Sequence, residues 1–290
     1  MNEGHRSPTV RRRRIAGELR RLREAAGLTH EDVAAELGWH RSKLGRIEGA
    51  QFVRLSLTDL RALLDLYGVR DRTERTALET MAKQARERGW WYSYSDVLPN
   101  PHATYIGLEA EAVSIRTFQA QLVPALLQTK EYSRAVVRAT RMTTRDNDES
   151  RRFLELLTAR QELLARQPPV KLWTVLDQAV LRRQVGGKAV MLAQLERLRE
   201  AADLPHVTLQ VLAEEAGEHA ALEGSFTILA FPEQADPDVI YLDAATGGIY
   251  LEKPEDRDRY TAVFDHAIAA ALSPKDSLAL IQRMADALRT

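Results

Sequence analysis

The chain contains no cysteine, and this absence excludes several kinds of chemistry. With no cysteine among 290 residues, disulfides, cysteine–zinc fingers, iron–sulfur clusters and thiol catalysis are all ruled out. No apolar run approaches the ~18 residues that a transmembrane helix needs. The basic N-terminus is not followed by the apolar segment of a secretory signal. We therefore expect a protein without a membrane anchor that works in the reducing cytoplasm.

Signatures of catalysis and cofactor binding are also missing. No GxGxxG occurs, and the seven histidines show neither HExxH nor the paired spacing of metal ligands. The segment GGKAV at 186–190 lacks the earlier glycine and the Ser or Thr that a phosphate-binding loop requires. We therefore predict no catalytic residue, no metal and no cofactor, and do not expect an enzyme.

Two polar positions in the second half of the chain allow both a chemical and a structural interpretation. Asp177 follows a predicted strand and is either a catalytic carboxylate or, as we favour, the cap of the next helix. His219 stands beside Glu218 and Glu223. This group is either a metal or acid–base cluster or, as we favour, a turn that carries charged residues.

Charge is balanced over the whole chain but not along it. There are 41 Lys+Arg and 41 Asp+Glu. Residues 1–89 hold 19 basic and 13 acidic side chains, a net charge of +6, so residues 90–290 hold the other 22 and 28, a net charge of −6. The basic part is a candidate for contact with a polyanion. The acidic part needs a different role.

The length and the pattern of the chain predict two domains. At ~100–200 residues per domain, 290 residues favour two. We expect a disordered arm over 1–10 and a helical domain over 11–70. A polar helix that leads away from this domain and an aromatic, proline-interrupted linker should follow over 71–102, and a second domain over 103–290.

In the second domain, the pattern changes from helical to alternating near residue 170. Residues 170–176 and 207–213 read as strands with a helix between them, which predicts a parallel pair. Three shorter strands follow as expected antiparallel neighbours. The domain is therefore predicted to be α/β, with about five strands in a mixed sheet. Its other predicted elements are helices over 105–121, 130–140, 149–166, 189–203, 256–272 and 274–288, and strands over 225–231, 238–243 and 248–252.

Residues 29–48 form two short amphipathic helices around a glycine turn. Leu44 and Ile47 supply the apolar side of the second helix, so its polar residues must point away from the core. Together with the helix before them, they predict a helix-turn-helix whose third helix enters the major groove of DNA. Arginine, lysine and serine can all bond to base edges there. The predicted base-reading residues are Arg41, Ser42, Lys43 and Arg46.

More basic residues flank the predicted helix-turn-helix. Arg54, in the loop after the third helix, is expected to contact the DNA backbone. One such module buries little surface, so we expect a homodimer on half-sites of double-stranded DNA about one helical turn apart. A run of four arginines either forms an arm along phosphates or in a minor groove, or is a solvated helix start, and both interpretations stay open. These are Arg11, Arg12, Arg13 and Arg14.

The spacing LT-x-x-x-VA-x-x-LG-x-x-x-S-K-L-x-R-I-E-G, from Leu28 to Gly49, resembles the phage-repressor-like (XRE-type) helix-turn-helix regulators. The resemblance implies that His30, at the start of the second helix, contacts a phosphate. It also implies that Arg23 and Glu48 form a structural ion pair between the first and third helices. His30 and His40 stand where that family has other residues.

Four further segments carry a second resemblance: ERGWWYSYSDVLP, YIGLEAEAVSIRTFQAQLVPALLQTKEYSRAVVRA, ARQELLARQPPVKLWTVLDQAVLRRQVGG and LPHVTLQVLAEEAGEHAALEGSFTILAF. They are similar to the C-terminal domain of actinobacterial antitoxin-like regulators of the WhiJ type. That domain has no known biochemical function. Such regulators are often encoded beside a small toxin-like protein. The resemblance therefore implies a regulatory and dimerisation domain that responds to a small partner protein.

A sequence-specific regulator of transcription, acting as a repressor or in an antitoxin-like way, is the function that these features favour. One alternative keeps the DNA-binding module and makes the second domain a small-molecule sensor. Its ligand region would be an aromatic cluster that also suits apolar packing between the domains. A further hypothesis makes the second domain an enzyme, which an α/β build permits. The aromatic cluster consists of Trp90, Trp91, Tyr92 and Tyr94.

Overall fold

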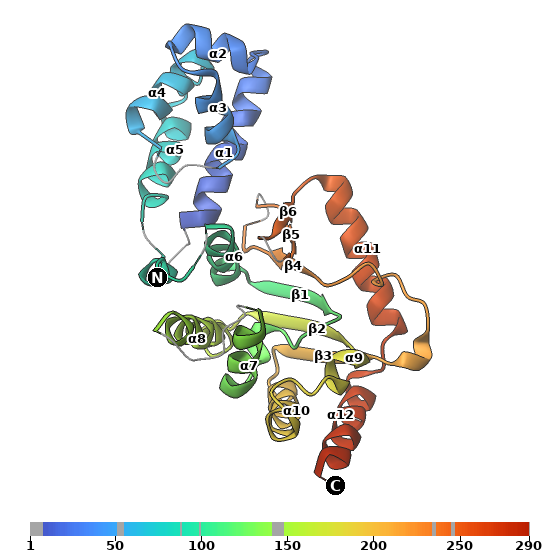
Figure 1. The fold of residues 1–290 in the computed structure, drawn as a ribbon. Coiled ribbons are helices and arrows are strands. Elements are labelled where there is room, and N and C mark those ends of the chain that lie inside the picture. The colour runs from blue at the N-terminus through green and yellow to red at the C-terminus, as the bar shows by residue number, and fades with distance from the viewer. Residues whose placement is uncertain are drawn as a thin grey trace. The chain divides into compact units, whose positions relative to one another are not determined.

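The computed structural model divides the chain into two compact units, which are described separately. The first unit covers Met1–Tyr92 and the second covers Ser93–Thr290. The structure describes residues 8–50, 55–87, 89–98, 100–140, 148–233, 236–244 and 247–289. Figure 1 shows a helical first unit and a second unit built on a sheet.

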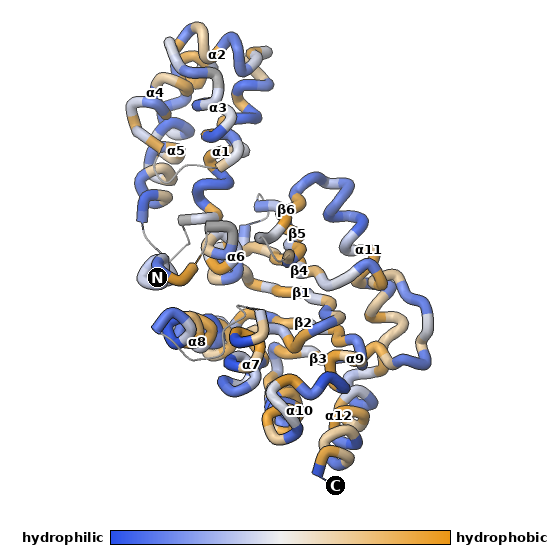
Figure 2. Tube along the Cα trace, in the orientation of Figure 1, coloured by the Kyte–Doolittle hydropathy of each residue, from blue (hydrophilic) through white to orange (hydrophobic). Residues whose placement is uncertain are grey.

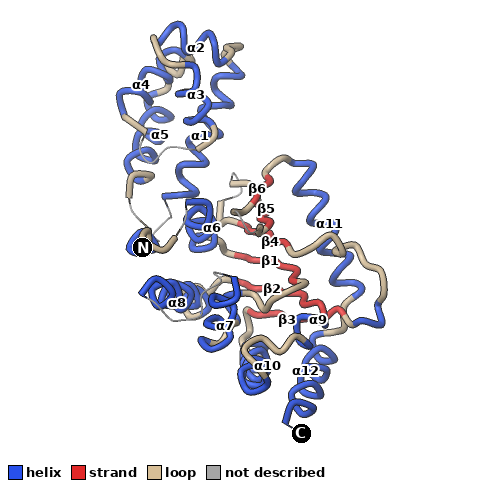
Figure 3. The backbone as a smooth tube through the Cα atoms, viewed as in Figure 1, coloured by secondary structure: helices blue, strands red, loops and turns tan. Residues whose placement is uncertain are grey.

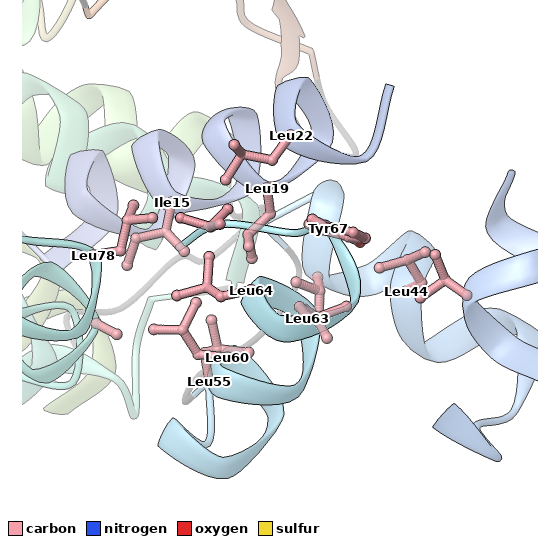
Figure 4. Packing of buried hydrophobic residues seen from close by; sticks show 14 of the residues in the cluster. Ile15, Leu19, Leu22, Leu44, Leu55, Leu60, Leu63, Leu64, Tyr67 and Leu78 are labelled. Carbon is pink, nitrogen blue, oxygen red and sulfur yellow. The ribbon is translucent and has the colours of Figure 1, made fainter. Parts of the chain in front are cut away.

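Helices packed around one apolar core make up the first unit. In Figure 2, α1 is mostly hydrophilic, with hydrophobic residues at intervals, as expected of a helix that buries one stripe. Figure 4 shows labelled core side chains from α1, α3, α4 and α5. Full burial of each leucine contributes about 1.5–3 kcal/mol. The helices are α1 (Pro8–Ala25), α2 (His30–Leu37), α3 (Arg41–Glu48), α4 (Leu57–Leu66) and α5 (Arg72–Gln84).

Helix α5 belongs to this bundle. Its polar sequence had suggested, wrongly, that it leads away from the bundle. It packs against α1 and α4. Leu78, Ala82 and Ala85 lie in the core, and their spacing of four and three residues forms a narrow apolar stripe. Small residues at two of the three positions make that stripe hard to recognise in the sequence. An ion pair from Arg61 Nε to Glu79 Oε1, at 2.8 Å, also joins α4 to α5.

The second unit is built on a six-stranded mixed sheet with the order β3-β2-β1-β4-β5-β6. The first three strands are parallel neighbours, and β4 runs antiparallel to β1 and to β5, which runs antiparallel to β6. The predicted α/β class, the parallel pair and the antiparallel neighbours are thus confirmed. The strands are β1 (Ser114–Gln119), β2 (Lys171–Asp177), β3 (Val207–Leu212), β4 (Phe226–Ala230), β5 (Val239–Leu242) and β6 (Ile249–Leu251).

The prediction of a helix over 105–121 is wrong for the second half of that range. Helix α6 covers Asn100–Glu111, and the chain then forms β1 at the centre of the sheet. Ile115 of β1 is level with Leu172 of β2 on one side and Leu229 of β4 on the other. The pairing partners are distant in sequence, so the local pattern could not reveal them. This strand raises the count from about five to six.

Helices flank the sheet, as Figures 1 and 3 show. Helix α11 contacts β1, β3 and β5, and its Phe264 and Ala267 share a buried cluster with Phe118 and Phe226 from the strands. Helix α12 packs along the edge strand β3 and against α10. The helices are α7 (Lys130–Thr140), α8 (Asp148–Gln161), α9 (Gln178–Arg182), α10 (Lys188–Ala202), α11 (Pro254–Ala270) and α12 (Pro274–Arg289).

A buried ion pair ties α6 to α8. Arg160 Nε donates to Glu109 Oε2 at 2.7 Å, and Arg160 Nη2 donates to Glu109 Oε1 at 2.8 Å. Tyr105 stacks against Tyr241 of β5 with ring centroids 4.3 Å apart. Burial raises the pKa of both tyrosines, so their hydroxyls stay neutral beside the ion pair. The cluster therefore fixes α6 on α8 and on the sheet.

Within the described part of the chain, no helix is both long enough and apolar enough to cross a membrane.

Candidate nucleic-acid interface

Backbone caps place α2 and the turn that follows it. Thr29 is the N-cap of α2, where its Oγ accepts a bond from Asp32 N at 3.2 Å and its own N donates to Asp32 Oδ2 at 2.8 Å. Hydrogen bonds to the Asp32 carboxylate, from the Thr29 hydroxyl at 2.7 Å and from the Thr29 N–H, lower the pKa of Asp32. Gly38 ends the helix in the left-handed region, at φ +63°, which costs glycine little. The chain can therefore turn sharply into α3.

Histidine fills the N-cap position of α3, where the resembling family has another residue. His40 Nδ1 accepts a hydrogen bond from Ser42 N at 3.3 Å and lies 2.9 Å from Ser42 Oγ. The imidazole therefore satisfies one of the free N–H groups at the start of the helix. Helix α3 is therefore capped even though residue 40 differs from the residue found in the resembling family.

Helix α3 has one buried and one exposed face. Leu44 and Ile47 are buried, whereas Ser42, Gly45 and Arg46 are exposed. Arg46 has no hydrogen bond or ion pair with another described residue. Apart from the adjacent residues and the backbone of α3, no described atom lies within 4 Å of the place of a Cβ on Gly45, so a bound molecule can approach the backbone there. The side chain of Arg41 lies outside what the structure describes.

Glu48 and Arg23 brace α3 against α1, as the resemblance implied. Arg23 Nε donates to Glu48 Oε1 at 2.7 Å and Arg23 Nη2 to Glu48 Oε2 at 3.0 Å. The side chains are 11% and 5% exposed. Arg23 Nη1 also donates to the carbonyl of Leu28 at 2.8 Å, so the guanidinium holds the turn before α2 as well. Burial and the charge of Glu48 raise the pKa of Tyr67, which keeps its phenol neutral.

His30 joins this brace, although it was predicted to contact a phosphate. It is the first residue of α2, and its Nε2 lies 3.0 Å from Glu48 Oε2. The contact with Glu48 occupies Nε2, so Nδ1 is the ring nitrogen left for a phosphate. The pairing was missed because Glu48 is 18 residues further along the chain.

Lys43 was predicted to read a base, but it is engaged within the protein. Its Nζ donates to Asp59 Oδ1 at 2.9 Å and lies 3.8 Å from the centre of the Trp39 ring. The sequence analysis missed both partners. Asp59 is in the first turn of α4, where an acidic residue usually serves its own helix.

The remaining predicted phosphate contacts are placed only in part. The four arginines Arg11 to Arg14 lie inside α1 and not in an arm ahead of it. Arg11 Nη1 is 3.5 Å from Glu87 Oε2, which links α1 to the residues after α5. The segment 1–7 and Arg54 lie outside the described residues, so their contacts with DNA stay predictions.

The aromatic residues predicted as a possible ligand region differ in exposure. Trp90 and Trp91 meet edge to face with centroids 6.0 Å apart. Trp91 is buried, whereas Trp90 and Tyr92 are exposed. Tyr94 lies 5.2 Å from the guanidinium carbon of Arg152.

Asp177 and His219 are bonded to the backbone of the second unit. Asp177 Oδ1 accepts from Ala179 N at 2.7 Å and caps α9, as favoured from the sequence. Its Oδ2 lies 3.9 Å from His219 Nε2. His219 Nδ1 accepts from Ala221 N at 3.2 Å, so the ring stabilises the turn in which it lies. Among the described residues, no group of three His, Cys, Asp or Glu could hold a metal ion.

Comparison with known families finds one match for each unit. A family described as a helix-turn-helix domain matches residues 14–78, which include α2 and α3. A family described as a domain of unknown function, DUF5753, matches residues 102–283. No curated protein and no solved structure matches the chain. The first unit therefore carries a DNA-binding helix-turn-helix, with α3 as its third helix.

Proposed function

Since the chain belongs to the DUF5753 family and carries a helix-turn-helix domain ahead of that region, we propose that it is a sequence-specific regulator of transcription. The observation that carries this proposal is the exposed face of α3. Arg46 is exposed there without a partner among the described residues, opposite the buried Leu44 and Ile47. An exposed arginine on a braced helix suits the bidentate recognition of guanine.

The surroundings of α3 support rigid docking on DNA. The pair of Arg23 and Glu48 fixes the angle between α1 and α3, and His40 caps the end of α3 that enters the groove. Bases are read by Ser42 and Arg46, together with Arg41. His30 contacts a phosphate, which positions the protein without adding sequence information.

The protein acts as a homodimer on a roughly palindromic operator in the cytoplasm, as a repressor or in an antitoxin-like way. One helix-turn-helix buries too little surface for tight binding, and the chain has a second, larger unit that can supply a dimer contact. Residues 90–290 carry a net charge of −6 (22 basic and 28 acidic), which disfavours DNA as their ligand. We assign this unit to dimerisation and to control by a small partner protein.

The role of the second unit is regulatory and not catalytic. Asp177, considered as a catalytic carboxylate, and His219, considered as part of a metal or acid–base cluster, each accept a backbone N–H. Both side chains thus have a structural task. The proposal predicts no turnover by this unit.

Selection of binding sites from random duplex DNA by the full chain tests the function. A charge reversal of Arg41→Glu with Arg46→Glu should abolish the mobility shift on the selected fragment. The matched control is Arg70→Glu with Arg72→Glu, two exposed residues beyond the far end of the 10-residue α4, which should keep binding within about threefold. A double variant at 41 and 46 that still shifts the fragment would show that α3 does not read the operator.

A further inference from the structure

Lys43 is the described cation of α3 that already has partners inside the protein. Its Nζ lies between Asp59 Oδ1 at 2.9 Å and the face of the Trp39 ring at 3.8 Å. The two partners come from different elements, the turn before α3 and the first turn of α4. Arg46, three residues further along α3, has no such contact with a described residue. The two cations therefore have different roles.

We propose that Lys43 is a positioning residue that neutralises Asp59, and that it does not read a base. The inference rests on the proposed function, and it removes Lys43 from the base-reading set predicted from the sequence, which leaves Arg41, Ser42 and Arg46. To reach a base edge, the ammonium would have to leave both the carboxylate and the indole. The half-buried side chains of Lys43 and Asp59 are screened by salt less than an exposed pair.

The position of Asp59 gives Lys43 this role. A carboxylate in the first turn of α4 is stabilised by the partial positive charge at that end of the helix. Asp59 N also bonds to Oγ of the cap residue Ser56 at 3.2 Å. The same carboxylate lies beside the face of α3 that meets DNA, within the ~10 Å over which charges act in salt solution. Without Lys43, it would repel the phosphates of a bound duplex.

This arrangement predicts how binding depends on each residue. Lys43→Met exposes the charge of Asp59, so the affinity for any duplex should fall about fivefold to tenfold. The ratio of the affinity for the operator to the affinity for unrelated DNA should stay unchanged. Asp59→Asn removes the need for neutralisation and frees Lys43 for phosphates. Affinity for both duplexes should then rise, and the salt slope should steepen by about one unit.

The experiment is a double-mutant cycle on the full chain. Binding of the wild type, Lys43→Met, Asp59→Asn and the double variant is titrated against the selected operator and an unrelated duplex of equal length, at several salt concentrations. The double variant should bind both duplexes within about twofold of the wild type, because neither charge remains. Circular-dichroism melting of each variant identifies any change that comes from unfolding.

Two matched controls make the cycle specific. Arg46→Met should lose preference for the operator, and adding Asp59→Asn should not restore it. Glu79→Gln removes the same charge from the Arg61 pair between α4 and α5, so it should leave both affinities unchanged.

Two results would overturn the inference. The first is that Lys43→Met weakens the operator alone and Asp59→Asn does not rescue it, because a base reader behaves in this way. The second is that Asp59→Asn, which keeps the lysine, fails to raise affinity for unrelated DNA. If the wild type selects no operator at all, the proposed function fails, and that outcome is visible before any variant is made.

Discussion

At the scale of single residues, the candidate interface depends most on the side chain of Glu48. It accepts two bonds from Arg23 and lies against His30, with only 5% of its side chain exposed. Glu48→Gln should destabilise the first unit by about 3 kcal/mol, since it takes the buried counter-charge from the largely buried guanidinium of Arg23. Scanning calorimetry of the full chain measures the change.

An exposed carboxylate in α1, the helix of Arg23, supplies the comparison. Glu24 accepts from Arg20 Nε at 2.9 Å and lies 3.5 Å from Arg23 Nη2, with more than half of its own side chain exposed. Glu24→Gln should therefore shift the transition far less than Glu48→Gln does, because solvent screens an exposed charge. Equal effects of the two substitutions would show that Glu48 is not a brace.

The sequence predicted the parts of the interface that depend on periodicity and on a known motif. Leu44 and Ile47 are buried because they share one side of α3, and Arg23 meets Glu48 as the resemblance of the sequence to a known motif implied. The partners of His30 and Lys43 are 18 and 16 residues away on other helices. Periodicity gives the face of a helix but not the tertiary partner, so both cations were assigned to DNA.

At the scale of elements, α2 depends on its capping box. Bonds from the hydroxyl and the N–H of Thr29 lower the pKa of Asp32. The resulting stability is present above the unfolded pKa of about 3.9 and is lost as pH falls through the lower folded pKa. Thr29→Ala should cost about 1 kcal/mol at pH 7 and weaken the acid dependence below pH ~4. Thermal melts at a series of pH values measure both effects, and an unchanged acid profile would contradict the assignment.

Helix α5 and strand β1 show why some elements were misread. Small residues such as Ala82 and Ala85 bury α5 without a strong apolar signal. The six residues of β1 form a strand by pairing with β2 and β4, whose residues are far along the chain. In both cases packing outside the element decides its structure or its place.

The contribution of α5 to the bundle leads to a direct test. Leu78 is buried in the core of the first unit, so Leu78→Ala should lower the stability of that unit by about 2–4 kcal/mol. The exposed Thr80 in the same helix is the control, and Thr80→Ala should change stability by less than about 0.5 kcal/mol. A negligible effect of Leu78→Ala in calorimetry would mean that α5 is only a connector.

At the scale of the whole molecule, charge divides the work between the two parts of the chain. Residues 1–89 carry a net charge of +6 (19 basic and 13 acidic) and include α2 and α3. The remainder carries a net charge of −6 (22 basic and 28 acidic) and includes the sheet. A homodimer would therefore present two basic surfaces to DNA, while its acidic parts are repelled from the phosphates.

The spacing of the operator tests this dimer. Two copies of α3 must reach the major groove on one face of the duplex, about 10–10.5 base pairs apart or at a multiple of this spacing. An insertion of about five base pairs between half-sites turns one of them to the opposite face. It should lower affinity at least about 100-fold, because one set of base contacts is lost. Mobility shifts on the selected operator and on the spaced duplex measure this loss, with a same-length duplex mutated in one half-site as the control. Binding that ignores the insertion would indicate that each copy binds DNA alone, and the dimer would have to be abandoned while the assignment of α3 remained.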